Sequence, residues 1–184
     1  VGFHGLVSAY NTDYAGAMDA LTSAIGIDKH RLHNKKTAVI GAGGVSRAIV
    51  AGLKDVGADI FIYNRTIEKA ESLAEEFGAR FGPLDEAVSD DIEIVINCTS
   101  IGMHPDIDRS PVRPDRIKPG MVVFDTVYNP LRTKLLRLAE QAGAKTVSGV
   151  EMFLRQAMAQ YKIFTGENAD EDLMRKTVLK NLKN

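Results

Sequence analysis

The chain has 184 residues, of which 45% are hydrophobic and 26% are charged, and its formal net charge is −1. This composition is ordinary for a globular protein, and the near-neutral charge argues against nucleic-acid or membrane binding. No apolar run approaches the roughly 18–20 residues that span a bilayer, and the first ten residues lack the pattern of a secretory signal. The single cysteine, Cys98, lies in an apolar run. We expect it to be a small buried residue of a cytoplasmic protein rather than a nucleophile.

The periodicity of apolar residues predicts alternating helices and strands. Thr12 and Thr66 are predicted to cap helices, and glycines end most of them. Residues 1–11 show no strong period, and we expect them to continue from an earlier part of a longer protein. In chain order the pattern predicts a helix at 13–25, a strand at 38–40, a helix at 45–56, a strand at 60–63, a helix at 67–77, a weak strand at 79–81, a short helix at 84–88, a strand at 92–97, a loop at 99–119, a strand at 121–124, a helix at 133–142, a strand at 146–147 and helices at 150–164 and 170–182.

Strands alternate with helices from residue 37 to residue 147. This order predicts an α/β fold in which helices cover both faces of a parallel sheet. About six strands are present, as in a Rossmann-like, doubly wound nucleotide-binding sheet. We therefore expect a mainly parallel six-stranded sheet with flanking helices and a C-terminal helical tail.

A glycine turn, GAGG at 41–44, joins the first strand of this region to its helix. In dinucleotide-binding folds the first glycine allows a tight turn, and the second lets the pyrophosphate approach the backbone. The third position must be small, and Ser46 satisfies that requirement. The free N–H groups of the helix start can then bind phosphate. The alternative is a glycine turn without a ligand, but the preceding strand and following helix favour the phosphate site.

The end of the second strand predicts which dinucleotide binds. Proteins that bind NAD usually have an acidic residue there for the ribose 2′-hydroxyl. This chain has Asn64, Arg65 and Thr66 instead, with Lys69 one turn further on. A guanidinium can hold a 2′-phosphate through charge-assisted hydrogen bonds of roughly 1.5–3 kcal/mol each. The position favours NADP(H) over the alternative that Arg65 and Lys69 are ordinary surface charges.

Polar residues follow the later strands at the same edge, where open α/β sheets bind ligands. Their hydroxyl, amide and carboxylate groups suit a small polyhydroxy substrate. From spacing alone, the NTD sequence at 11–13 is best read as a helix cap. The edge residues are at 99–103, 125–128, 149–152 and 156.

Several motifs in this order resemble the shikimate dehydrogenase family, and the resemblance covers almost the whole chain. The motifs are NTD at 11–13, GAGGVSRA at 41–48, NRTIEKAESLA at 64–74, INCTSIGM at 96–103, DTVYNP at 125–130 and GVEMFLRQA at 149–157. Residues 99–112 and 148–166 are most similar to the forms fused to a 3-dehydroquinate dehydratase.

The resemblance implies an oxidoreductase that reduces 3-dehydroshikimate to shikimate with NADPH, on the chorismate pathway of aromatic amino-acid biosynthesis. It implies that Asp13 hydrogen-bonds a substrate hydroxyl and pairs with a catalytic lysine, and that Tyr128 and Gln156 contact the substrate. The cofactor contacts predicted from the turn, the strand end and the resemblance are Gly41, Ala42, Gly43, Gly44, Val45, Asn64, Arg65, Thr66, Lys69, Thr99, Thr126, Gly149 and Met152.

In the family this resembles, the catalytic lysine belongs to an N-terminal substrate domain, and no lysine here lies in a matching motif. We therefore expect residues 1–36 to be a hinge segment and lead-in helix, 37–148 the NADP-binding domain, and 149–184 helices that pack back toward the substrate domain. The chain alone is expected to bind NADP(H) but to turn substrate over poorly. The alternatives are a quinate or quinate/shikimate dehydrogenase, a non-catalytic NADP-binding regulator, and an interaction module without ligand.

Overall fold

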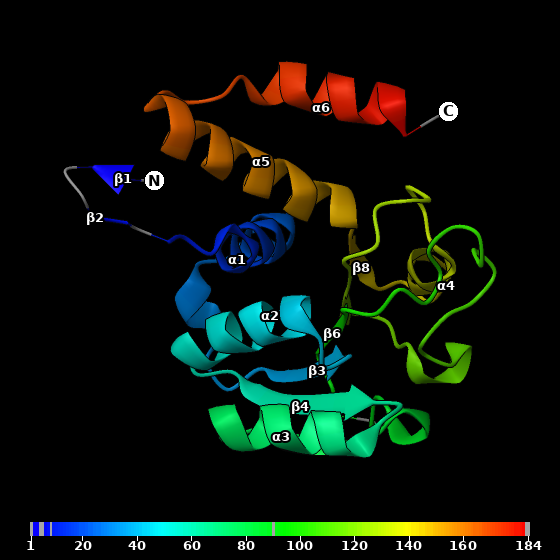
Figure 1. The fold of residues 1–184 in the computed structure, drawn as a ribbon. Coiled ribbons are helices and arrows are strands. Elements are labelled where there is room, and N and C mark those ends of the chain that lie inside the picture. Colours follow the sequence, from blue (N-terminus) through cyan, green and yellow to red (C-terminus); the bar gives the residue numbers. More distant parts are fainter. Residues whose placement is uncertain (1, 4–5, 8, 90, 183–184) are drawn as a thin grey trace.

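The structure is a computed structural model that describes residues 2–3, 6–7, 9–89 and 91–182, so part of the 1–36 segment and the last two residues of the tail lie outside it. A six-stranded sheet, parallel at every pairing, forms its centre in the order β5-β4-β3-β6-β7-β8 (Figure 1). The predicted doubly wound fold is confirmed. The strands are β3 (Lys36–Ile40), β4 (Asp59–Asn64), β5 (Arg80–Pro83), β6 (Ile94–Asn97), β7 (Val122–Asp125) and β8 (Lys145–Val147).

The helices follow the predicted order with small shifts at their ends. They are α1 (Thr12–Ile25), α2 (Gly44–Asp55), α3 (Ile67–Phe77), α4 (Lys134–Gln141), α5 (Gly149–Thr165) and α6 (Glu171–Asn181). Short 3₁₀ turns lie at η1 (Lys29–Leu32), η2 (Leu84–Glu86) and η3 (Pro114–Arg116). The sequence pattern did not predict the antiparallel strands β1 (Gly2–Phe3) and β2 (Leu6–Val7). No described helix is both long and apolar enough to cross a membrane.

Two local predictions were wrong in detail, and a third, that Thr66 caps α3, was confirmed without a side-chain hydrogen bond. The predicted helix at 84–88 is only the η2 turn, because Val88 has a positive φ of 69° and no helix continues through it. Asn11, not Thr12, caps α1, because its side-chain oxygen accepts hydrogen bonds from the backbone N–H groups of Asp13 and Tyr14. Thr66 occupies the N-cap position of α3 without a side-chain hydrogen bond, while the Asn64 amide donates to the Thr66 carbonyl at 2.8 Å.

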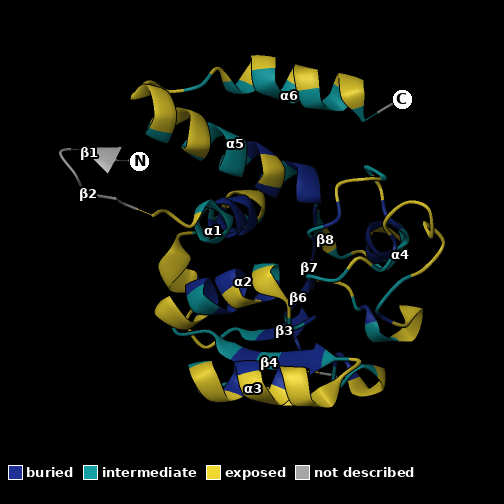
Figure 2. Cartoon of the chain, viewed as in Figure 1, coloured by how far each residue is buried: buried dark blue, intermediate teal, exposed yellow. Residues whose placement is uncertain are grey.

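Two apolar layers cover the two faces of the sheet (Figure 2). On one face, a row of register partners packs beneath α1, α2, α3 and the start of α5. Alternation along each strand turns the intervening residues, such as Ala38 and Val95, toward α4 and the loops of the other face. The row on the first face consists of Val39, Ile62, Ile96, Phe124 and Val147.

Helices α1 and α5 lie against each other above the sheet (Figure 1). Gly16 makes this close approach possible: a Cβ there would lie 2.7 Å from Cγ of Gln156 and 3.1 Å from the Met152 carbonyl oxygen. Helix α6 has no buried residue and is joined to α5 by ion pairs of Arg175 and Arg155. The packing of α1 on α5 therefore brings together two helices that are far apart in the sequence.

Candidate functional site

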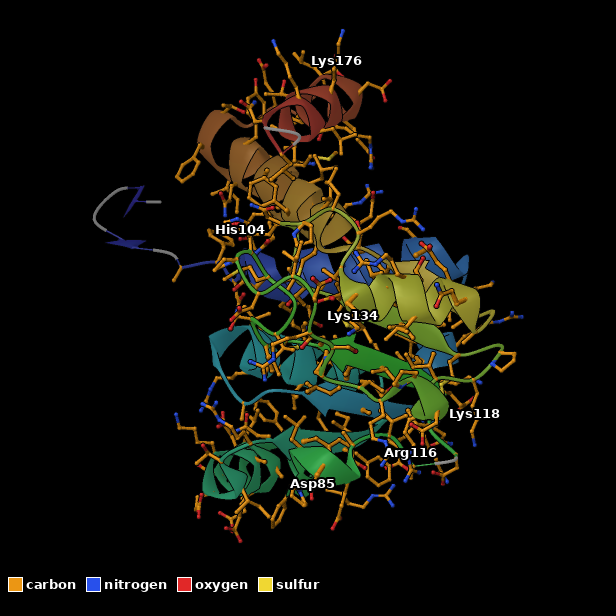
Figure 3. The ribbon with its side chains drawn as sticks, turned by 90° about the vertical axis from the view of Figure 1, so that its right-hand side faces the viewer. Asp85, His104, Arg116, Lys118, Lys134 and Lys176 are labelled. Atoms are coloured by element: carbon orange, nitrogen blue, oxygen red, sulfur yellow. The ribbon has the colours of Figure 1, made fainter. Side chains whose placement is uncertain are left out.

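A cavity of about 480 Å³ lies at the carboxyl edge of the sheet. In Figure 1 the arrow of β4 points to this edge, and the same side faces the viewer in Figure 3. Its volume is within the usual range for a small-molecule site. Four segments line it: the turn after β3, the end of β4 with the start of α3, the η2 turn and the loop after β6. Eight of the predicted cofactor residues are in its wall: Gly41, Ala42, Gly43, Asn64, Arg65, Thr66, Lys69 and Thr99.

Two glycines of the glycine turn have different roles: Gly41 is required by the backbone, and Gly43 has free space beside it. Gly41 has a φ of +111°, and a Cβ there would lie 3.0 Å from Thr99 Cγ2 and 3.2 Å from Ser46 Oγ. Gly43 is the N-cap of α2, and its backbone N–H donates to Ser46 Oγ at 3.2 Å. A Cβ on Gly43 would meet nothing within 4 Å. Gly41 thus serves the turn, whereas Gly43 leaves free space at a helix N-terminus that suits a phosphate.

The cationic side of the cavity is formed by Arg65 and Lys69. Both side chains are exposed, and neither has an ion pair or hydrogen bond within the described part of the chain. Arg65 also lines a second cavity of about 480 Å³ at the end of β5, next to η2 and Asp85, which Figure 3 labels. The two cavities share Leu84 as well. The open groove fits a long ligand with an anionic group near Arg65.

A buried polar network supports the floor of this edge. Asp125, at the end of β7, is fully buried; one carboxylate oxygen accepts from the Asn97 amide at 2.9 Å and from the Val127 backbone at 3.1 Å. The other oxygen accepts from the Thr133 hydroxyl at 2.6 Å. Asn97 in turn accepts from both the backbone and the hydroxyl of Thr99. The network therefore fixes the loops that leave β6 and β7.

The surroundings of the buried Asp125 and the partly buried Cys98 shift the pKa values of both side chains. Desolvation raises the pKa of Asp125 to about 6, against hydrogen bonds from Thr133, Val127 and Asn97 that lower it. Asp125 lies at the predicted edge, but its buried carboxylate has no access to solvent and so is not available to a substrate in this structure. Burial raises the pKa of the Cys98 thiol to about 12, which keeps it protonated at neutral pH. This agrees with the expectation that Cys98 is not a nucleophile.

A second group of predicted residues meets where α1 packs on α5. The Gln156 amide donates a hydrogen bond to the Asp13 carboxylate, although the two residues are 143 positions apart. Tyr128 follows β7, is 44% exposed, and its ring centroid lies 5.3 Å from that of Phe153 on α5. The predicted substrate residues Asp13 and Gln156 are thus brought together by the fold.

The remaining predicted cofactor residues lie outside the wall of the cavity. Gly149 is pressed against the chain after β7: a Cβ there would lie only 2.4 Å from the Thr126 carbonyl oxygen. Met152 is buried in the core between α5 and the sheet. Gly44 and Val45 form the first turn of α2. Thr126, Gly149 and Met152 thus have packing roles, whereas Gly44 is exposed and has free space beside it, and the contact of all five positions with a cofactor stays a prediction.

Sequence reasoning missed several residues of the cavity wall, among them the two charged residues Asp106 and Arg109. Both belong to the long loop after β6, where no periodic pattern indicates which side chains turn inward. The buried network around Asp125 was also missed. A polar residue at the end of each of two adjacent apolar strands, Asn97 and Asp125, is the signal that could have indicated it.

The strand order, the glycine turn at the start of α2 and the cavity define a dinucleotide-binding α/β domain. A family model described as Shikimate / quinate 5-dehydrogenase matches residues 25–130, and one described as Shikimate 5'-dehydrogenase C-terminal domain matches residues 149–179. The chain belongs to the shikimate/quinate dehydrogenase family, as the sequence motifs predicted.

Individual relatives agree with this assignment. A protein of Methanosarcina acetivorans named shikimate dehydrogenase (NADP(+)) is 41% identical over 97% of this chain and 66% of its own length. A bifunctional 3-dehydroquinate dehydratase/shikimate dehydrogenase of Arabidopsis thaliana is also 41% identical, over 92% of this chain and 30% of its own.

Solved structures give the same result. A shikimate dehydrogenase crystallised with NADP+ matches with a TM-score of 0.89 and 37% identity, over 98% of this chain and 64% of that chain. A shikimate 5-dehydrogenase of Thermus thermophilus, in complex with NADP(H) and shikimate, matches with a TM-score of 0.82 and 31% identity, over 97% of this chain and 65% of that chain. The chain thus spans about two thirds of the length of these relatives.

Proposed function

We propose that this chain is the NADP(H)-binding part of a shikimate dehydrogenase. The observation that carries the proposal is one continuous cavity that contains both the glycine turn and the Arg65–Lys69 pair. The space beside Gly43 admits a pyrophosphate against the start of α2, and two unpaired cations stand where a 2′-phosphate would lie. The relatives with NADP in their names or ligands support the same cofactor.

When bound, the cofactor carries the hydride that reduces the carbonyl of 3-dehydroshikimate. The role of this chain is to bind the cofactor and to orient it. Arg65 and Lys69 hold the anionic end of the cofactor, and the backbone N–H groups of α2 hold its pyrophosphate. The Asn97–Asp125 network keeps the loops after β6 and β7 in one conformation. Such fixed geometry avoids the entropic cost of ordering these groups during the reaction.

The substrate side of the proposal rests on the α1–α5 contact. Asp13 and Gln156 offer a carboxylate and an amide to the hydroxyl groups of a small polyhydroxy acid, and the Gln156 amide orients the Asp13 carboxylate. In the family, a lysine works with this aspartate; within the described residues no lysine is paired with Asp13. We infer that this chain alone binds the cofactor and reduces substrate slowly, because general acid–base help typically contributes 10²–10⁴ in rate.

The first test is the choice of cofactor. Titration of the chain with NADPH, followed by its fluorescence, is expected to show saturable binding that is much tighter than binding of NADH. Arg65→Gln should weaken NADPH binding by about 10–100-fold and leave NADH almost unchanged, because each charge-assisted bond contributes roughly 1.5–3 kcal/mol. Arg31→Gln, at an exposed arginine outside the cavity, is the matched control. Equal affinity for the two cofactors in the wild-type chain would contradict the proposal.

The second test asks whether a side chain at Gly43 affects NADPH binding more than it affects the stability of the fold. Gly43→Val should destabilise the chain by no more than about 1 kcal/mol, because an N-cap prefers glycine to valine but a Cβ there has no neighbour within 4 Å. The same variant should lose NADPH binding by about tenfold or more, since its side chain would occupy the path by which the pyrophosphate reaches the backbone. Paired unfolding and NADPH titrations measure both effects. Unchanged affinity would show that the cofactor does not approach α2.

A further inference from the structure

Arg109 stands in the wall of the cavity and has no role in the function proposed above. It belongs to the loop after β6, and its side chain is exposed. In residues 2–3, 6–7, 9–89 and 91–182, nothing pairs with its guanidinium by an ion pair or a hydrogen bond. An arginine that faces a cavity without a partner is available to an anionic ligand.

The loop holds Arg109 in place from both sides. The backbone carbonyl of the preceding residue, Asp108, accepts a hydrogen bond of 2.9 Å from Lys134 of α4, which Figure 3 labels. The Asp108 carboxylate also lies 3.8 Å from Arg137 of the same helix. On the other side, the Ser110 hydroxyl donates to the Val112 carbonyl at 2.8 Å. The guanidinium is therefore presented from an anchored backbone.

Contacts and topology place Arg109 beside the glycine turn. Gly102 also lines the cavity, and a Cβ on it would lie 2.9 Å from the Arg109 carbonyl oxygen. Earlier in the same loop, Thr99 touches Gly41. Because β3 lies between β4 and β6, the turn after β3 lies between the end of β4, which leads to Arg65, and the start of the loop that carries Arg109. The glycine turn and the two arginines thus line one cavity.

The other charged residues near the glycine turn do not supply a cation for the pyrophosphate. Arg47, the nearest basic residue in α2, is paired with Glu76 of α3 and is outside the cavity wall. Asp106, in the Arg109 loop, also lines the cavity and opposes an anion there. Arg65 and Lys69 are committed to the 2′-phosphate at the end of β4. Arg109 is therefore the basic residue of the cavity wall that is left for a pyrophosphate at the start of α2.

We propose that Arg109 binds the pyrophosphate of the cofactor and so contributes equally to NADP(H) and NAD(H) affinity, in contrast to Arg65. The inference rests on the proposed function, because it presumes that a dinucleotide occupies this cavity. The loop after β6 would then bind the pyrophosphate, which is a different part of the cofactor from the 2′-phosphate.

The test compares three ligands, NADPH, NADH and 2′-AMP, by calorimetric titration of the 184-residue chain. Arg109→Gln should weaken NADPH and NADH by the same factor, about 10–100-fold, and leave 2′-AMP unchanged, since 2′-AMP has no pyrophosphate. Arg65→Gln should weaken NADPH and 2′-AMP but not NADH. Arg109→Lys, which keeps the charge but loses the bidentate fork, should fall between the wild type and Arg109→Gln. Arg31→Gln should match the wild type.

The titrations distinguish failure of the Arg109 inference from failure of the proposed function. If Arg109→Gln leaves all three affinities unchanged while the wild type binds NADPH, the inference fails and the proposed function stands. If Arg109→Gln weakens NADPH and 2′-AMP but not NADH, Arg109 belongs to the 2′-phosphate site and the inference fails. If the wild-type chain shows no saturable NADPH binding, the proposed function fails and this inference fails with it.

Discussion

Gly149→Ala is expected to destabilise the chain by at least about 3 kcal/mol, because the added methyl group would overlap fixed backbone atoms. Its Cβ would lie 2.4 Å from the Thr126 carbonyl oxygen and 2.6 Å from two backbone carbons of Thr126 and Val127. No side chain can rotate away to relieve this overlap. Helix α5 must therefore move from the end of β7, and Met152, which α5 inserts into the core, would move with it.

The expected loss corresponds to a fall in Tm of about 6–12 °C for a chain of this length. Thermal and urea unfolding followed by circular dichroism would measure it. The matched control is Gly44→Ala, which also adds a methyl group at the first position of a helix but has no neighbour within 4 Å. That variant should be as stable as the wild type or slightly more stable, because alanine favours the helix. A Gly149→Ala chain within about 1 kcal/mol of the wild type would contradict the argument.

The sheet could be predicted from the sequence because each strand and helix is indicated by the pattern of apolar residues within its own segment. Apolar runs such as 94–97 and helical spacing such as 67–77 indicate one element each, and their alternation restricts the topology to a parallel sheet. The glycine turn and Arg65 could be predicted for the same reason, since the fold places both at the ends of adjacent strands. These predicted residues do line one cavity.

The rest of the site depends on contacts between distant segments. The hydrogen bond of Gln156 to Asp13 spans 143 positions, and the clash that requires Gly149 comes from Thr126. Arg109 lies in a loop without periodicity, and its inward position follows from the anchoring of Asp108 on α4. The spacing of residues along the sequence does not predict such contacts between distant segments. The motifs that resemble the family indicated several of the residues, but not how they are held.

Asp125→Asn is expected to change how stability depends on pH, because Asp125 is the buried carboxylate at the centre of the Asn97–Thr133 network. Burial raises its pKa from an ordinary value of 3.8 to about 6. Between these pH values the folded chain holds a proton that the unfolded chain releases. The stability that this group contributes is therefore fully present below pH 3.8 and is lost as the pH rises through about 6. The loss amounts to about 3 kcal/mol, at roughly 1.4 kcal/mol for each tenfold change in protonation.

An asparagine cannot ionise, so the Asp125→Asn chain should lack this loss. The free energy of unfolding of the variant minus that of the wild type should rise by about 3 kcal/mol between pH 3 and pH 7. Urea unfolding at several pH values would measure the difference, in which the titration of all other groups cancels. Asp85→Asn, at an exposed aspartate of the same edge, controls for the loss of one negative charge. A difference that stays constant over this range would mean that Asp125 is ionised in the folded chain throughout, with its three hydrogen-bond donors outweighing the cost of its burial.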